Sequence, residues 1–362
     1  MRRLDRRTFL KGLGATVPVF FGGQLLEACG GGGGSAAPSG SGGKLTVSQL
    51  VVAGGGGALT DAYRQAYYQP FMAKTGVKIL ETAVDPAKLK SMVSSGDVEW
   101  DVAQIDAAAA ASAAYDGLLE RLDYRIINKD GLIPQMVHDA YLINDLAAYV
   151  IAWNTKKYQG EDAPQTWADF FNVHRFPGTR GLLNTPGQTL EVVLLGAGVD
   201  PKHLYPLDVE RALKFLDPIK SQLRFWSTGA QSAQWLIDDE VDLGTSWNGR
   251  LQAPKAQGSP VDFTFNQSLL VADAWIVPKG AKHKDASMQF IAFCMQARNQ
   301  AREAELIPYG PTNTKAFSYL DPQVKALLPN APGHHYALIQ DFDWWARNQD
   351  RVTQTWNDWL SS

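Results

Sequence analysis

Strand-like apolar stretches in the first part of the chain alternate with segments that place apolar residues at helical spacing. The strand-like stretches are residues 45–53, 77–80 and 100–105. Thr60 is the expected N-cap of the first helix, which Thr75 and Gly76 end. Pro86 opens the second helix, and Asp106 begins an alanine-rich third. Strands that alternate with helices of about 10–15 residues predict a mostly parallel α/β sheet.

The same pattern begins again after residue 147 and predicts a second α/β unit. Strands are expected at residues 148–153, 181–183, 241–247 and 272–277. Helices are expected at residues 166–171, 190–195, 230–237 and 285–303, and again from about Asp321, where the chain is rich in tryptophan. Two such units fit a chain of 362 residues, since a domain has about 150 residues. Ligands of open α/β sheets bind beyond the carboxyl ends of the strands, so the loops at those ends form the candidate site.

The composition is that of a globular protein, with 45% apolar and 20% charged residues. It excludes a disordered, collagen-like or polytopic membrane protein, and two cysteines exclude a disulfide framework. The first 28 residues hold five basic and two acidic side chains, so the rest of the chain carries a net charge of −6. Such an acidic body argues against nucleic acid as a partner, because phosphates require a basic surface.

The first residues have the features of an export signal. Residues 6–11, Arg-Arg-Thr-Phe-Leu-Lys, resemble the twin-arginine signal, with Asp5 as the one departure. The weakly apolar stretch that follows is too short for a helix of about 20 residues that spans a membrane. We therefore expect an exported, periplasmic protein.

A lipoprotein-type cleavage site is expected before Cys29, which makes residues 1–29 the signal region. Glu27 is unusual in such a site, but residues 30–43 form a Gly/Ser-rich tether that suits a lipid-anchored body. Cys29 is therefore the expected point of lipid attachment, and simple cleavage to a soluble exported protein is the alternative. The other cysteine, Cys294, lies in an apolar helical segment and is expected to be buried.

Four motifs in order resemble the extracellular solute-binding proteins of ABC importers, specifically the spermidine/putrescine-binding type. They are residues 71–76, residues 246–250 (Ser-Trp-Asn-Gly-Arg), residues 273–280 with 285–293, and residues 307–313. The resemblance implies a two-lobed type II periplasmic-binding fold with a hinged cleft, crossed by two or three strands. It also implies a lobe 1 at about residues 44–150 plus 276–308, and a lobe 2 at about residues 151–273 plus 309–362.

The resemblance also implies a set of ligand-binding residues. In polyamine-binding members, aromatic rings cover the ligand's methylenes and carboxylates bind its ammonium groups. Trp247 matches a stacking tryptophan, Asp273 an ammonium-binding aspartate and Tyr309 a wall tyrosine, while Glu191 lies near a family carboxylate. The loops that precede the helices add Asn248, Gly55 and Asp106 as candidates. Trp275 is assigned to the core.

Departures from the family pattern change the expected ligand chemistry. Val271 replaces a family tryptophan, Gly54–Gly57 stand where polyamine binders place aromatics, and one acidic residue is missing from the loop at 185–191. Arg250 would repel a diamine and would clamp a carboxylate. Two ligand classes therefore stay open: a polyamine such as putrescine or spermidine, and a zwitterion such as γ-aminobutyrate, an amino acid or a sugar–amino acid conjugate.

The expected function is capture of a small amine-containing solute for delivery to ABC permease subunits, by a monomer with no cofactor and no metal. The structural alternative for Asp273 is an ion pair with Arg250 in the empty protein, which would weaken the site hypothesis. An exported hydrolase is the remote alternative. It would require a Gly-x-Ser-x-Gly elbow, a His-Glu-x-x-His pair or a phosphate-binding loop, and none of these motifs occurs in the sequence.

Overall fold

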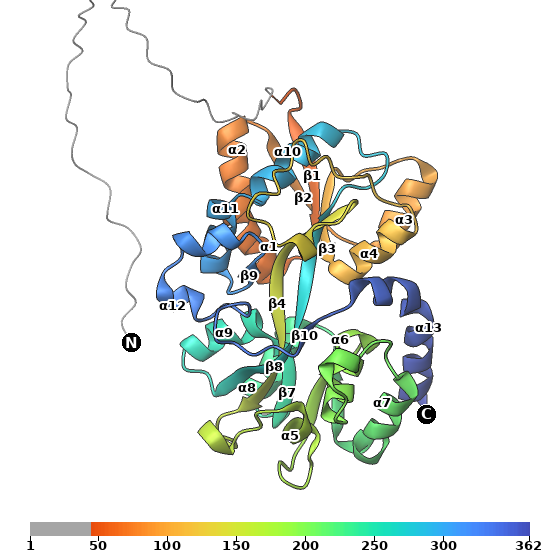
Figure 1. Ribbon diagram of the computed structural model, residues 1–362, viewed down its shortest axis with the longest axis vertical. Coiled ribbons are helices and arrows are strands. Elements are labelled where there is room, and N and C mark those ends of the chain that lie inside the picture. The colour runs from red at the N-terminus through yellow and green to blue at the C-terminus, as the bar shows by residue number, and fades with distance from the viewer. Residues whose placement is uncertain (1–44) are drawn as a thin grey trace, which may run out of the picture. The chain divides into compact units, whose positions relative to one another are not determined.

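The computed structural model describes residues 45–362, and Figure 1 shows two α/β lobes that share one mixed sheet. Neighbouring strands follow the order β2-β1-β3-β8-β4-β7-β5-β6. The strands are β1 (Gln49–Gly54), β2 (Lys78–Ala83), β3 (Val102–Asp106), β4 (Tyr141–Asn154), β5 (Arg180–Leu183), β6 (Leu223–Trp226), β7 (Leu243–Trp247), β8 (Val261–Ile276), β9 (Gly310–Pro311) and β10 (Leu338–Ile339). Within each lobe the outer strands are parallel: β1 with β2 and β3, and β5 with β6 and β7. The predicted two-lobed α/β class is confirmed.

Two long strands, β4 and β8, connect the lobes. They pair with each other antiparallel, and the far end of β8 pairs with β3 of lobe 1 while β4 pairs with β7 of lobe 2. Every residue of β4 is buried, which explains its nearly continuous apolar sequence. The sequence pattern predicted only the parts at 148–153 and 272–277, because the remaining strand residues lack a clear apolar alternation.

Helices cover the sheet in both lobes. Lobe 1 carries α1 (Gly57–Tyr63), the π-helical η1 (Arg64–Tyr68), α2 (Gln69–Thr75), α3 (Pro86–Ser95), α4 (Ala107–Tyr115), η2 (Pro134–Met136), α10 (Lys284–Cys294) and α11 (Ala297–Leu306). Lobe 2 carries η3 (Gly160–Asp162), α5 (Trp167–Phe171), α6 (Pro186–Gly196), η4 (Pro201–His203), α7 (Val209–Leu216), η5 (Asp217–Gln222), α8 (Gly229–Ile237) and α9 (Asn248–Ala256).

Two local predictions about helices are wrong. The first helix begins at Gly57 rather than after Thr60, because Gly56 and Gly57 adopt positive φ angles and turn the chain there. The segment predicted as one helix at 285–303 is two helices, separated where Gln296 takes an extended conformation. The side chain of Asn313 donates to the Met295 carbonyl at 3.0 Å, so this break leaves that backbone group satisfied.

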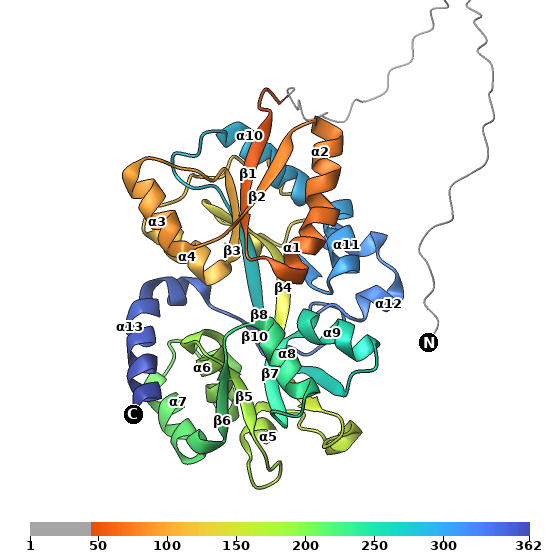
Figure 2. The same ribbon diagram turned by 180° about the vertical axis from the view of Figure 1, so that it is seen from behind.

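The C-terminal segment contacts both lobes. Its elements are η6 (Thr314–Tyr319), α12 (Pro322–Lys325) and α13 (Phe342–Ser361). The apolar side chains of η6 and of residues 320–331 pack on α11 of lobe 1, and α13 runs from α4 of lobe 1 along lobe 2 (Figure 2). This packing differs from the predicted limits of lobe 2, residues 151–273 plus 309–362, because residues 314–331 bury their apolar face against lobe 1.

Cys294 is buried in α10, and burial raises the pKa of its thiol, which makes it unreactive. Within residues 45–362, none of the helices combines the length and the apolar character that crossing a membrane requires. The predicted export signal, the Cys29 attachment site and the tether fall at residues 1–43, outside the described residues.

Candidate ligand-binding site

Three aspartates lie abreast where the sheet passes from lobe 1 toward lobe 2. Asp273 on β8 is in register with Asp106 at the end of β3 on one side and with Asp145 on β4 on the other. Like charges on directly opposed strands repel one another. The arrangement is therefore costly in the empty protein, which is typical of a binding site rather than of a structural core.

Asp273 is the member of this row that is free to bind a cation. It is half-buried, and the side chain of Gln104 hydrogen-bonds to it. Burial raises the pKa of Asp273 well above its usual range, and the charges of Asp145 and Asp106 raise it further. Among the described residues no lysine, arginine or histidine lies within ion-pair distance of it. The ion pair with Arg250 that would have weakened the site hypothesis is absent from residues 45–362.

Arg250 reaches this region from α9 of lobe 2. It lies in the first turn of α9, and its Nε lies 2.9 Å from the position that a Cβ on Gly229 would occupy. Its Nη1 lies 3.5 Å from the corresponding position on Gly57, the first residue of α1 in lobe 1. The guanidinium therefore extends between two glycines, one in each lobe. Its Nε is buried and has no hydrogen-bond partner in the described part of the chain.

Aromatic side chains flank Arg250. The half-buried Trp247 indole donates to Gln188 Oε1 at 2.9 Å and packs edge-on against Trp226, with ring centroids 5.2 Å apart. Tyr309 is buried and lies so close to Gly249 that a Cβ there would come within 2.5 Å of its ring. Burial raises the pKa of Tyr309, while the nearby charge of Arg250 lowers it. The structure thus brings Trp247, Arg250 and Tyr309 together.

Asn248 and Glu191 have different surroundings. The Asn248 side chain accepts from the Ala148 amide at 2.9 Å and donates to the Pro308 carbonyl at 2.7 Å. These bonds hold the start of α9 against β4. Glu191 Oε1 accepts hydrogen bonds from three groups, Tyr205 at 2.7 Å, Gln340 at 2.9 Å and Trp345 at 2.6 Å. Its described contacts join α6 to the C-terminal segment rather than to the aspartate row, and a ligand contact by either residue stays a prediction.

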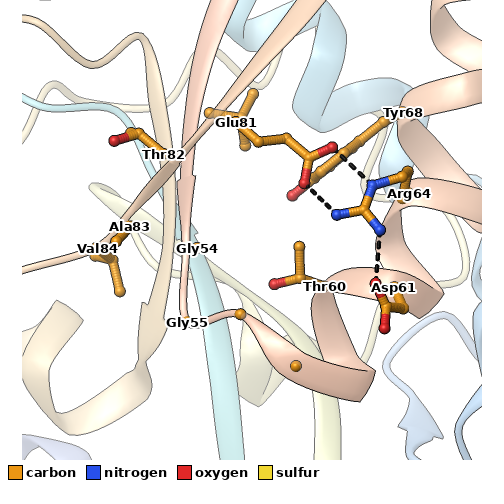
Figure 3. Close-up of a pocket in the computed structure, with 13 residues that line it drawn as sticks. Gly54, Gly55, Thr60, Asp61, Arg64, Tyr68, Glu81, Thr82, Ala83 and Val84 are labelled. Atoms are coloured by element: carbon orange, nitrogen blue, oxygen red, sulfur yellow. Dashed lines mark hydrogen bonds and ion pairs between the residues drawn. The ribbon is translucent and has the colours of Figure 1, made fainter.

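The remaining candidates lie at the ends of β1 and β3. Asp106 caps α4, accepting from the amides of Ala108 at 2.9 Å and Ala109 at 3.1 Å through Oδ1. Gly55 lines a pocket of about 360 Å³ at the ends of β1 and β2, with Thr60 and the ion-paired Arg64 and Glu81 on its wall (Figure 3). A ligand contact by Gly55 or Asp106 likewise stays a prediction.

The sequence analysis missed Asp145, Gln104 and Gln188. Asp145 carried a usable signal, because an aspartate in a nearly continuous apolar strand needs a partner when it is buried. Gln188 has a positive φ of 69°, which the sequence does not reveal. Among residues 45–362 no group of three or more histidine, cysteine, aspartate or glutamate side chains has the arrangement of a metal site.

Two lobes that share two long strands, with an acidic row facing an unpaired arginine, define a binding protein for small solutes. The chain belongs to the family of bacterial extracellular solute-binding proteins, whose sequence pattern matches residues 66–330. It is the substrate-binding component of an ABC importer and not an enzyme. As in its periplasmic relatives, the protein is exported.

Several relatives and solved structures are similar to this chain. A γ-aminobutyric acid-binding protein of Pseudomonas aeruginosa is 34% identical over 83% of this chain and 87% of its own. The spermidine/putrescine-binding periplasmic protein of Escherichia coli is 22% identical over 73% of this chain and 79% of its own. The solved structure of a GABA receptor superposes with a TM-score of 0.81 at 37% identity, over 86% of this chain and 97% of that one. The structure of a binding protein of A. tumefaciens R10 in complex with agropinic acid superposes with a TM-score of 0.79 at 34% identity, over 87% of this chain and 99% of that one.

Proposed function

We propose that this protein binds a zwitterionic ω-amino acid such as γ-aminobutyrate between its lobes. Asp273 takes the ammonium group, Arg250 takes the carboxylate, and Trp247 and Tyr309 flank the methylene chain. The observation that carries the proposal is the unpaired state of Arg250 and Asp273. Arg250 extends from α9 of lobe 2, and Asp273 lies on the part of β8 that pairs with β3 of lobe 1. Their charges are close enough to interact, yet the two side chains form no ion pair within the described residues.

A zwitterion satisfies both groups at once. A half-buried acid without a counter-ion and a buried guanidinium nitrogen without an acceptor each cost free energy in the empty protein. The ligand's two ends supply the missing partners through charge-assisted hydrogen bonds, which are about twice as strong as neutral ones. Arg250 extends from α9 of lobe 2, whereas Asp273 lies beside β3 of lobe 1, so a ligand held by both side chains favours the closed arrangement of the lobes.

The relatives support the same ligand class. Those whose names refer to GABA are 34% and 37% identical to this chain, whereas the spermidine/putrescine-binding relatives are between 22% and 25% identical. The aspartate row would also suit a polyamine, which is why a diamine is the competing ligand. Arg250 argues against it, because a guanidinium beside Gly57 would repel the second ammonium group.

Isothermal titration with four compounds tests the proposal. γ-Aminobutyrate carries both charges, butylamine lacks the carboxylate, butyrate lacks the ammonium, and putrescine replaces the carboxylate with a second ammonium. We expect γ-aminobutyrate to bind, and each singly charged analogue to bind about 100-fold more weakly or worse, since a lost charged partner costs about 2–5 kcal/mol. Butylamine binding as tightly as γ-aminobutyrate would remove Arg250 from the site, and tighter binding of putrescine would establish the polyamine alternative.

We also propose that the twin-arginine signal exports the chain and that Cys29 is acylated, so that the tether holds a monomeric body near its permease subunits. A single lipid chain gives only reversible membrane binding, which the usual multiple acylation of such a cysteine would overcome. Labelling with a radioactive fatty acid tests the anchor. Wild type should incorporate the label and Cys29→Ala should not; equal labelling of both chains would contradict the assignment.

A further inference from the structure

Asp145, the neighbour of Asp273 in the aspartate row, forms a pair of acids with Glu303 that the ligand contacts described above do not use. Asp145 and Glu303 are buried to 1% and 2% exposure, on β4 and α11 respectively. The side chain of Asn144 donates to both, at 2.9 Å to Asp145 Oδ2 and 3.2 Å to Glu303 Oε2. One amide group therefore holds the two carboxyl groups side by side.

Two tyrosines complete this acid pair from the neighbouring helical segment. The Tyr63 hydroxyl donates to Asp145 Oδ2 at 2.5 Å, and the Tyr67 hydroxyl donates to Glu303 Oε2. Tyr63 ends α1 and Tyr67 lies in the π-helical η1, and π-helical turns of this kind are frequent at functional sites. The Trp275 indole fixes Asn144 by donating to its Oδ1 at 2.8 Å.

The remaining oxygens of the pair, Asp145 Oδ1 and Glu303 Oε1, have no other hydrogen-bond partner among the described residues. Two buried carboxylates that both carried a charge would repel strongly, so one proton has to lie between them. Burial and the charge of Asp145 raise the pKa of Glu303 well above its usual range, and the hydrogen bond between the two groups raises it further. The pKa of Asp145 is raised by burial as well, so the proton belongs to the pair as a whole.

Within residues 45–362, the charged and titratable groups around the acid pair include no cation in contact with it. They are Tyr63 on α1, Tyr67 on η1, Cys294 on α10, Asp273 on β8, Asp106 on β3 and Tyr309, with Arg250 beyond Asp273 on α9. No described lysine, arginine or histidine makes an ion pair with Asp145 or Glu303. The positive charge closest to the pair in the working protein is consequently the ligand's ammonium on Asp273.

We propose that Asp145 and Glu303 form a proton-sharing acid pair that sets the charge of the ammonium subsite, and that an ammonium group arriving at Asp273 drives the shared proton out. The shared proton leaves the acid pair for solvent or buffer, and the hydrogen bonds from Tyr63, Tyr67 and Asn144 then stabilise two carboxylates. One positive charge enters as another leaves, so the buried region keeps its net charge. This coupling rests on the proposed function, and Asp145 and Glu303 act as positioning residues because they do not touch the ligand.

Proton release on binding is the direct test. γ-Aminobutyrate is titrated into the purified protein in buffers of different ionisation enthalpy, at pH values from about 5 to about 9, and the dependence on buffer gives the number of protons released. The variant Glu303→Gln removes the titrating proton, and Glu305→Gln is the matched control, since it lies on the same helix but is exposed and paired with Arg302. At the pH where the two proteins differ most, Glu303→Gln should release up to about one proton fewer per ligand bound than wild type. Glu305→Gln should release as many protons as wild type at every pH.

If wild type, Glu303→Gln and Glu305→Gln all release the same number of protons, the protons come from Asp273 itself, and the proposal is overturned. Tyr67→Phe provides a second variant in case Glu303→Gln does not fold. It removes one donor to the Glu303 carboxylate, so it should move the pH of half-maximal release upward without abolishing release. An unmoved release profile in Tyr67→Phe would contradict the pair as its source.

A readout without ligand separates this proposal from the proposed function. A carboxyl group whose pKa is raised in the folded state stabilises the protein at low pH, and that contribution is lost as the pH rises through the raised pKa. The unfolding free energy of the empty wild type should therefore fall above about pH 5, and the slope should be smaller in Glu303→Gln but not in Glu305→Gln. If γ-aminobutyrate does not bind at all, the proposed function fails, and equal slopes in all three proteins would show that the acid pair fails too.

Discussion

The two walls of the candidate site are built in different ways. The acidic wall consists of three aspartates on the adjacent strands β3, β8 and β4, and one of them, Asp145, forms the acid pair with Glu303 and its two tyrosines. The basic wall is one side chain, Arg250, extended from the start of α9 between two glycines. The acidic wall is thus part of the sheet, whereas the basic wall depends on open space around a flexible group.

This difference assigns different tasks to the walls. Strands in register hold the aspartates at fixed positions, so the location of the ammonium is determined by the backbone. A single arginine can adjust its position along the ligand, but it is easily displaced by any group that enters its space. Both walls are unfavourable in the empty protein, since like charges adjoin on one and an unpaired guanidinium nitrogen is buried on the other.

Of the variants that test this difference between the walls, Asp273→Asn should have the largest effect on ligand binding. The variant removes the anion that receives the ammonium, so we expect binding of γ-aminobutyrate to weaken about 100-fold or more, on the scale of 2–5 kcal/mol for a lost buried charge partner. The same change relieves repulsion from Asp145 and Asp106, so the empty variant should melt at a higher temperature than wild type. Titration calorimetry and thermal unfolding measure the two effects.

Asp262→Asn is the control for this variant, because Asp262 lies on the same strand but forms an ion pair with Lys255. It should leave affinity unchanged. Near-normal affinity in Asp273→Asn would mean that another carboxylate of the row receives the ammonium. A lower melting temperature would mean that Asp273 stabilises the empty sheet.

The basic wall should respond in steps to changes at Arg250. Arg250→Ala removes the carboxylate partner and should weaken binding about 100-fold, whereas Arg250→Lys keeps a charge without the paired donors and should weaken it about 10-fold. Affinity for butylamine should stay nearly constant across both variants, since that compound has no carboxylate. Lys255→Ala, on the same helix, is the control. A parallel loss for butylamine would show that Arg250 supports the fold of the site rather than the carboxylate.

Much of this site could be predicted from the sequence, and the physical reasons for the misses are specific. Asp273 and Arg250 could be found because each is a charged residue beside an apolar strand, within a motif of known resemblance. Asn144 and Asp145 would point to opposite faces in a regular strand. A register shift between Ile143 and Asp145 lets the side chain of Asn144 hydrogen-bond to that of Asp145. No local pattern in the sequence predicts this shift.

The acid pair was missed for a related reason. Glu303 lies 158 positions after Asp145, and only the packing of α11 on the sheet brings them together. The predicted single helix at 285–303 would also have turned Glu303 differently from α11, which begins anew at Ala297. The fold class was more accessible, because the alternation of strands and helices extends over the whole chain, whereas the site depends on a few contacts between distant residues.

The smallest and most specific prediction concerns the space around Arg250. A Cβ on Gly229 would lie 2.9 Å from Arg250 Nε and 3.0 Å from the Trp247 ring, so Gly229→Ala must displace one of them. Gly229 is the first residue of α8, where alanine has less advantage over glycine than in the middle of a helix, so the melting temperature should change little. Affinity for γ-aminobutyrate should fall about 3-fold to 10-fold, roughly 1 kcal/mol, while butylamine binding changes less. Gly181→Ala on β5 is the matched control, because a Cβ there comes no closer than 3.5 Å to a neighbouring side chain, and it should bind as wild type does. Equal affinities in the two variants would show that Arg250 can move aside at no cost in binding. The basic wall would then tolerate a change in its surroundings, in contrast to the aspartates, whose positions the strands fix.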